Sequence, residues 1–148
     1  MILSRENEYL GWDYGNPSTR NDTSVTGWQV MALKSSKAAG FEIGNSFEGA
    51  KNHFDKVTPE VQGDSDPRLS DLCAYTYYTD KDQPGSRNVT CTSISLLCRV
   101  FMGQDTNSRI MQALANKMLE NVPTTIQDGD FYMWYYATLA MFQMGGDY

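Results

Sequence analysis

Apolar residues recur at helical spacing in five stretches of the chain, which predicts five helices. Three of these stretches carry apolar residues around most of the helix circumference, at about residues 24–39, 89–102 and 131–144. The two stretches between them carry a single apolar stripe, at about residues 44–56 and 106–121. A helix that is apolar on all sides is typical of a buried position, and a helix with one stripe is typical of the surface. The alternation therefore predicts two layers, with an inner row of three helices and an outer row of two.

Glycine and aspartate residues support these helix limits. A glycine directly follows each inner stretch: Gly40, Gly103 and Gly145. Glycine is favoured there because it adopts the left-handed conformation that ends many helices. Asp13, Asp22 and Asp130 lie at or near helix starts, where a carboxylate caps free backbone N–H groups. If two of these carboxyls converged, one would have a raised pKa and could act as an acid.

The rest of the chain is rich in turn-forming residues. Within the long connection, residues 73–79 are β-branched and aromatic, which predicts a short extended segment or strand. We expect one all-α domain over residues 1–148. Its parts are a loop that contains aromatic residues at 1–23, a helical hairpin at 24–56, a long insertion at 57–88, a second hairpin at 89–121 and an unpaired inner helix at 131–145.

Composition and charge narrow the function classes. The chain has 148 residues, of which 41% are hydrophobic and 20% charged, as in an ordinary globular domain. Its net charge of −6 argues against a nucleic-acid-binding groove, which needs a basic patch. No apolar run approaches the length of a membrane span, and the first residues do not form a signal peptide. The compartment stays open, because the chain can be a piece of a longer protein.

Metal chemistry is not indicated by the sequence. Zinc sites use clustered Cys and His residues at short spacing. The chain has one histidine, His53, and three scattered cysteines, Cys73, Cys91 and Cys98. We therefore expect no metal and no cofactor, and we expect the three thiols to pack as small buried side chains.

Several motifs resemble repeats of the prenyltransferase and squalene-cyclase-like family of α/α toroids. Residues 10–15, Leu-Gly-Trp-Asp-Tyr-Gly, look like the G-W-x-Y entry of such a repeat. Residues 24–35, 88–103 and 127–146 are similar to successive inner helices. The resemblance is closest to an uncharacterised, non-cyclase bacterial branch. It implies an incomplete α/α toroid, because a full terpenoid cyclase or protein prenyltransferase ring has more hairpins than this chain provides.

The resemblance also implies which chemistry to look for. Terpenoid cyclases of this kind use an Asp-rich motif, to which Asp64-Ser65-Asp66 and Asp128-Gly129-Asp130 are only near matches. Prenyltransferase β subunits bind zinc through Asp, Cys and His, but His53 falls on a predicted surface helix. The Gly-Cys-Gly-Glu-Gln motif of the thioester toroids does not occur in the sequence. We therefore favour a non-catalytic role, and the sequence leaves enzymatic activity open.

Aromatic residues make up 12% of the chain and supply most candidate ligand contacts. Those on the inner helices either line a central cavity or fill the core: Trp28, Trp134 and Tyr135. Others lie in loops that we expect to gather at the N-terminal ends of the inner helices: Trp12, Tyr14, Tyr75 and Tyr77. We name no catalytic residue among them.

One charge stands alone on an otherwise apolar inner helix. Because an unpaired buried charge is costly, we expect Arg99 to have a buried partner such as Asp130 or a backbone carbonyl. The alternative is that Arg99 binds an anion. Arg99 and Asp130 complete the set of candidate ligand-binding residues.

These observations favour a non-catalytic α/α-toroid module. An open ring exposes apolar helix faces, which usually mark interfaces. We therefore expect binding to a partner protein, to a neighbouring domain or to a second copy. The alternative is an enzyme or small-ligand binder that acts on an isoprenoid or a polysaccharide in an aromatic-lined cavity. A carboxylate pair facing such a cavity would favour the alternative, and an uncovered apolar edge would favour the binding module.

Overall fold

The computed structural model describes residues 6–7, 10–15, 18–58, 73–125, 129–146 and 148. Its elements are β1 (Arg20–Asp22), α1 (Thr23–Ala38), α2 (Ser46–Val57), β2 (Thr76–Tyr78), β3 (Gln83–Pro84), α3 (Val89–Phe101), α4 (Arg109–Glu120) and α5 (Phe131–Met144). The mostly helical fold is thus confirmed, and each helix limit lies within three residues of its prediction. Residues 59–72 of the predicted insertion, which include Asp64-Ser65-Asp66, lie outside the described residues.

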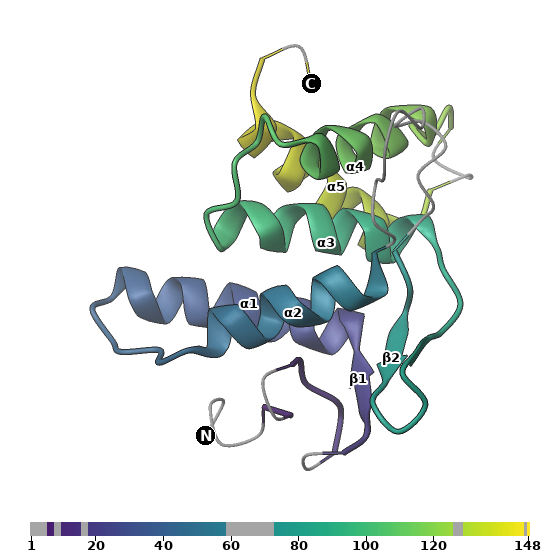
Figure 1. Ribbon diagram of the computed structural model, residues 1–148. Coiled ribbons are helices and arrows are strands. Elements are labelled where there is room, and N and C mark those ends of the chain that lie inside the picture. The colour runs from purple at the N-terminus through teal and green to yellow at the C-terminus, as the bar shows by residue number, and fades with distance from the viewer. Residues whose placement is uncertain (1–5, 8–9, 16–17, 59–72, 126–128, 147) are drawn as a thin grey trace.

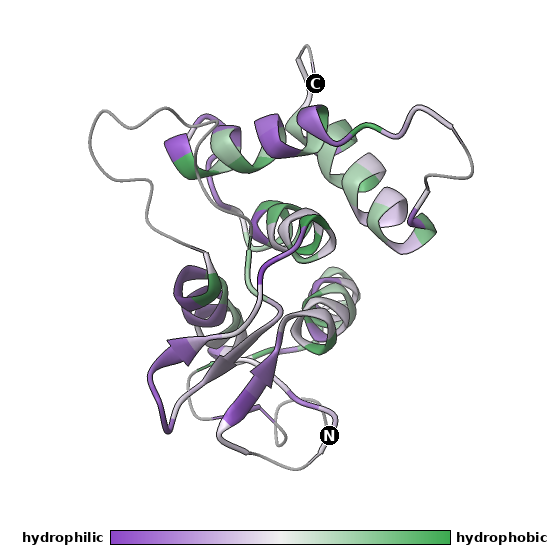
Figure 2. Ribbon diagram, turned by 90° about the vertical axis from the view of Figure 1, so that its right-hand side faces the viewer, coloured by the Kyte–Doolittle hydropathy of each residue, from purple (hydrophilic) through white to green (hydrophobic). Residues whose placement is uncertain are grey.

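Helix α3 is the centre of the fold. It packs between α1 and α5. In Figure 1, α1, α3 and α5 start at the same end of the molecule, whereas α2 and α4 start at the opposite end. Figure 2 views α1, α2 and α3 nearly along their axes and shows α4 and α5 from the side, so α4 and α5 cross α3 obliquely. The view in Figure 2 shows α2 and α4 on one side of α3, and α1 and α5 on the other. The chain direction thus alternates from one helix to the next, but the predicted alternation of buried and surface helices is not present throughout, because α5 fully buries only two residues.

The helices of the row differ in burial. In α3, all nine residues of Cys91–Arg99 are buried, as predicted. The prediction that the first and last helices of the row are buried on all sides is wrong, because α1 buries one face and α5 fully buries only Tyr136 and Ala140. The physical reason is their position. They stand at the two ends of the row, where no neighbour among the described residues covers their outer faces.

A small antiparallel sheet in the order β1-β2-β3 lies beside the helices. The strand predicted within residues 73–79 is confirmed as β2, but β1 and β3 lie in segments that were predicted as loop and connection. The segment that leads into β2 also anchors two helix starts. Thr23 N–H at the start of α1 donates to the carbonyl of Tyr75 at 2.9 Å, and Asn88 N–H before α3 donates to that of Cys73 at 3.1 Å.

Caps place the starts of α1, α3 and α5 at one end of the molecule. The side chains of Asp22, Asn88 and Asp130 accept hydrogen bonds from backbone N–H groups in the first turns of these helices. Asp130 also accepts a hydrogen bond of 2.7 Å from the hydroxyl of Thr90, which ties the start of α5 to that of α3. Asp13 is not a cap, because it pairs with Arg20.

Close packing between α1 and α3 depends on Gly27. A Cβ atom at this position would lie 2.5 Å from Cγ2 of the buried Ile94, far inside van der Waals contact. Any larger residue would push α1 away from α3. The row is therefore tightly joined on the α1 side of α3.

Candidate functional site

Helix α5 carries the most unusual surface of the described chain. None of its fourteen residues is charged. Six of them are exposed, and four of these six lie at positions i, i+4, i+7 and i+11, which places them on one face of the helix: Phe131, Tyr135, Thr138 and Phe142. The three aromatic side chains are exposed by 67%, 46% and 79%, in chain order. We call these four residues the α5 stripe.

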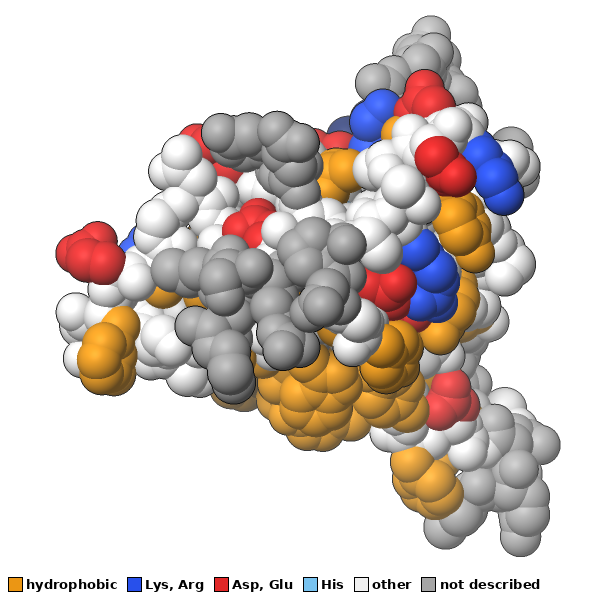
Figure 3. Space-filling model, turned by 90° about the horizontal axis from the view of Figure 1, so that it is seen from below, with side chains coloured by type: hydrophobic (Ala, Val, Ile, Leu, Met, Phe, Trp, Pro, Cys, Tyr) orange, Lys and Arg blue, Asp and Glu red, His pale blue; other side chains and the backbone are white. Residues whose placement is uncertain are grey.

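An aromatic cluster continues this surface towards α1. The buried Tyr136 makes edge-to-face contacts with Trp28, Tyr132 and Tyr135, with ring centroids 5.1 to 6.2 Å apart. The indole N–H of Trp28 donates to the hydroxyl of Tyr132 at 3.1 Å, and half of the Trp28 side chain stays exposed. On the face that Figure 3 shows, hydrophobic side chains form one larger group and several smaller, separate patches. Much of the exposed aromatic surface thus lies on α5 and the adjoining part of α1, although Tyr14 and Phe41 are exposed elsewhere.

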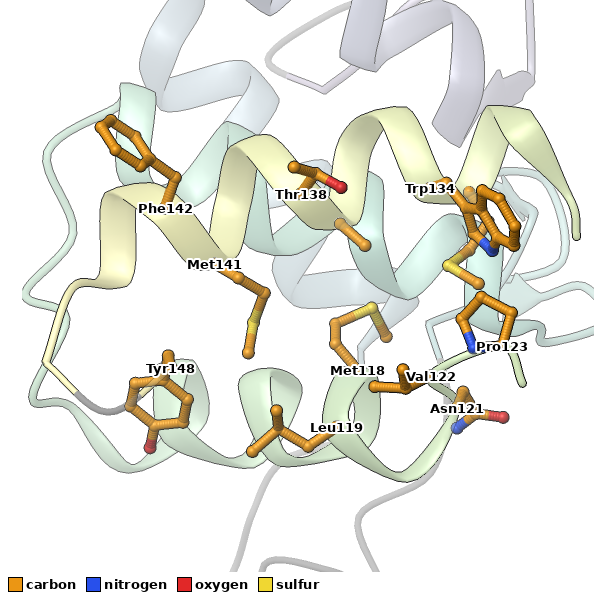
Figure 4. A pocket seen from close by; sticks show the side chains of 12 residues that line it. Met118, Leu119, Asn121, Val122, Pro123, Trp134, Thr138, Met141, Phe142 and Tyr148 are labelled. Carbon is orange, nitrogen blue, oxygen red and sulfur yellow. The ribbon is translucent and has the colours of Figure 1, made fainter. Parts of the chain in front are cut away.

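A groove of about 500 Å³ separates α5 from α4 (Figure 4). It is lined by Met118, Leu119, Asn121, Val122, Pro123, Met133, Trp134, Ala137, Thr138, Met141, Phe142 and Tyr148. Figure 4 shows Trp134 and Pro123 at one end and Phe142 and Tyr148 at the other. Thr138 and Phe142 belong both to this lining and to the α5 stripe, so the groove and the stripe form one surface. None of its lining residues is charged.

Trp134 is held in a fixed position at the groove. A Cβ atom on Gly129 would lie 2.5 Å from its indole ring, so the ring packs directly on the glycine backbone. The indole Nε1 is buried without a hydrogen-bond partner. Trp134 therefore combines a half-buried ring with an unused hydrogen-bond donor.

The four aromatic residues predicted to gather at the helix starts divide into two kinds. Trp12 and Tyr77 are exposed by only 2% and 4%, and they belong to the core. Tyr14 and Tyr75 are exposed, and Tyr75 lies near Arg20, whose guanidinium carbon is 5.7 Å from the ring centroid. A hydrogen bond to Asp22 raises the pKa of Tyr75. The four side chains therefore do not share one surface.

Arg99 is buried, but its partner is not the expected one. Its guanidinium donates to Asp55 at 2.7 Å, to Gln104 at 2.9 Å and to Ser95 at 3.2 Å. The prediction that Asp130 is the partner of Arg99 is wrong. Asp130 lies at the start of α5, at the end of the molecule opposite to the last turn of α3. Arg99 thus joins α3 to α2.

The two members of the Arg99–Asp55 ion pair differ in burial. The Arg99 side chain is exposed by 1% and the Asp55 side chain by 44%. Partial burial acts to raise the pKa of Asp55, but hydrogen bonds from Lys51 and Arg99 and their charges hold it below its usual value. Removing Asp55 should therefore change the stability of the protein by a different amount than removing Arg99.

We expect Asp55→Ala to lower the free energy of unfolding by about 2 to 3 kcal/mol, because it leaves a buried cation with too few acceptors. We expect Arg99→Met to have a smaller effect, because Asp55 can turn to water. Urea unfolding of both single variants and the double variant measures this. The double variant should lose less than the sum of the two single variants, and additive losses would contradict the pairing.

The predicted surface position of His53, the one histidine of the chain, is wrong. It was predicted on a surface helix, but the structure buries it completely in the core-facing side of α2. The spacing contained the signal, because position 53 is three residues after Ala50 and four before Val57, both of which are buried. His53 therefore offers no accessible metal ligand.

The hydrogen bonds define the state of the His53 ring. The Thr23 hydroxyl donates to the Ala74 carbonyl at 2.7 Å, so its oxygen accepts from Nε2–H of His53 at 3.0 Å. Nδ1 is buried without a partner. Burial lowers the pKa of His53 to about 3, with Arg99 acting in the same direction and Asp22 against it. The ring is thus neutral over the physiological pH range.

The remaining candidate chemistry is structural. Cys73, Cys91 and Cys98 are buried free thiols, as predicted, and burial raises the pKa of Cys73 to about 11 and that of Cys91 to about 12. Asp13 and Asp22 do converge, but on the guanidinium of Arg20 rather than on each other. In the described ranges no group of three or more Cys, His, Asp or Glu residues is placed to hold a metal ion.

The α5 stripe and the groove are therefore the candidate site, and they offer contact surface rather than a reactive group. Of their residues, Trp134 and Tyr135 were predicted from the sequence, as was the neighbouring Trp28, whereas Phe131, Thr138 and Phe142 were not. The available signal was the absence of charge on the whole helix. None of the described helices is long and apolar enough to cross a membrane. Comparison with models of known protein families, with curated proteins and with solved structures gave no match.

Proposed function

We propose that this chain is a non-catalytic binding module that docks onto a protein surface through α5. The observation that carries the proposal is the exposed, uncharged stripe on a helix that fully buries only two of its residues. Concentrated apolar patches usually mark interfaces. The centres of interfaces are enriched in aromatic residues and methionine and depleted in charge, as are the stripe and the adjoining groove. The partner is another protein, a neighbouring domain or a second copy.

We further propose that the five helices are part of an α/α toroid of the terpenoid cyclase and prenyltransferase type. The shared direction of α1 and α3 supports this proposal, as does the gathering of the starts of α1, α3 and α5 at one end. The antiparallel helices α2 and α4 would then be the outer layer. On this proposal, the partner covers the part of the inner row that α5 leaves open.

A second candidate function is the binding of a small apolar molecule. The groove between α4 and α5 is in the size range of ligand pockets, which is roughly 300 to 1,000 Å³. Its three methionines and Trp134 suit an isoprenoid better than a polysaccharide, which needs many hydrogen-bonding groups. No Asp or Glu side chain lies among its lining residues, so the groove favours binding rather than turnover.

Site-specific photo-crosslinking tests the docking proposal. A benzoylphenylalanine replaces Tyr135 in the stripe and, in a control variant, Phe41, which is an exposed aromatic residue between α1 and α2. Both variants are expressed in the full reading frame in the native cell. We expect a discrete crosslinked product from position 135 that position 41 does not give. The same products from both positions, or none from position 135, would contradict the proposal.

A further inference from the structure

We infer that the occupant of the α5 stripe is a second copy of this chain, with the two α5 helices packed antiparallel about a two-fold axis. The inference rests on the proposed docking function and names its partner. It follows from three properties of the described residues: the symmetry of the stripe, the absence of charge on α5 and the area that the stripe exposes.

The α5 stripes of two copies are complementary in shape when the two helices are antiparallel. A two-fold axis between residues 136 and 137 places Phe131 opposite Phe142 of the second copy. The same axis places Tyr135 opposite Thr138 of the second copy, so a large ring faces a small side chain. A parallel pair would instead set each tyrosine ring against its own copy. The antiparallel arrangement therefore fills the interface better, and it forms the isologous contact typical of homodimers.

Electrostatics also favours self-association at this helix. The whole chain carries a net charge of −6, which opposes the approach of two copies. None of the fourteen residues of α5 is charged, so contact there keeps the like charges of the two copies apart. Antiparallel packing also places the dipoles of the two helices in opposite directions. A partner with charged contact residues would find no matching charge on the stripe.

The exposed area predicts a weak dimer. The three aromatic side chains of the stripe are exposed by 46% to 79%. With about 200 Å² for each aromatic side chain, two copies would remove roughly 800 Å² from water in total. This area is below the roughly 1,200 Å² of a standard stable interface. We therefore expect a dimer with a Kd in the micromolar range, which depends on concentration.

Light scattering during size-exclusion chromatography measures this equilibrium over a range of protein concentrations. We expect Thr138→Glu to raise the Kd at least tenfold, because it places two carboxylates beside the two-fold axis. Asn45→Asp is the control, because it adds the same charge at an exposed position before α2. A monomer at every concentration would overturn the inference, as would equal effects of the two substitutions.

Crosslinking tests the direction of the helices. Tyr135→Cys and Thr138→Cys variants are mixed and treated with a short bismaleimide. The three native cysteines are buried, so the introduced thiols react selectively. We expect the mixed pair to crosslink more than either variant with itself. Preferential self-crosslinking of Tyr135→Cys would overturn the antiparallel arrangement. A monomer that still photo-crosslinks another protein from position 135 would overturn only this inference and leave the docking proposal intact.

Discussion

Lowering the pH from 6.5 to 4.5 is expected to reduce the free energy of unfolding by about 2 to 3 kcal/mol, through the single residue His53. In the unfolded chain, His53 takes up a proton near pH 6.5. In the folded protein, burial lowers its pKa to about 3, so the ring stays neutral. Between these two pH values the unfolded state binds more protons, so stability is fully present above pH 6.5 and falls as the pH decreases. The slope approaches about 1.4 kcal/mol per pH unit.

Denaturant unfolding at several pH values measures this slope, and His53→Gln is the matched variant because its side chain does not titrate. The chain has no other histidine. The carboxyls of Asp22, Asp55 and Asp130 have lowered pKa values, so their contributions are lost at lower pH. The substitution can change stability at pH 7, but it should flatten the dependence between pH 6.5 and 4.5. An equal slope in both proteins would show that His53 is not buried in its neutral form.

The helices could be predicted from sequence because their signals are local. Asp22 and Asp130 cap the helices that directly follow them, and Gly103 ends α3 with a positive φ of 86°. Strands β1 and β3 could not be predicted, because they have three and two residues and show no alternation. β1 exists through pairing with a distant segment, in which Arg20 faces Tyr78. No local pattern contains that information.

The candidate site could be predicted only in part, for a related reason. The absence of charge on residues 131–144 indicated an unusual helix, but a helix that is apolar on all sides shows no contrast between its faces. Which face is covered depends on packing against α3. That packing buries Tyr136 and leaves Tyr135 exposed by 46%, although the two residues are adjacent and chemically identical.

Substitutions of Tyr135 and Tyr136 should have very different effects on the free energy of unfolding. Tyr136 lies at the centre of the aromatic cluster, so Tyr136→Ala should lower the free energy of unfolding by about 3 to 5 kcal/mol. Its hydroxyl is buried without a partner, and burial raises its pKa. Tyr136→Phe should therefore be neutral or stabilising. Tyr135→Ala loses one edge-to-face contact and should cost about 1 kcal/mol or less.

The most direct test of a two-faced α5, with one face in the core and the other open for docking, is a comparison of Tyr135→Ala and Tyr136→Ala by denaturant unfolding. The measurement is made at a protein concentration at which light scattering shows a monomer. We predict a large loss for position 136 and a small one for position 135. Similar large losses at both positions would show that the stripe belongs to the core of the single chain, and would contradict the proposed docking surface.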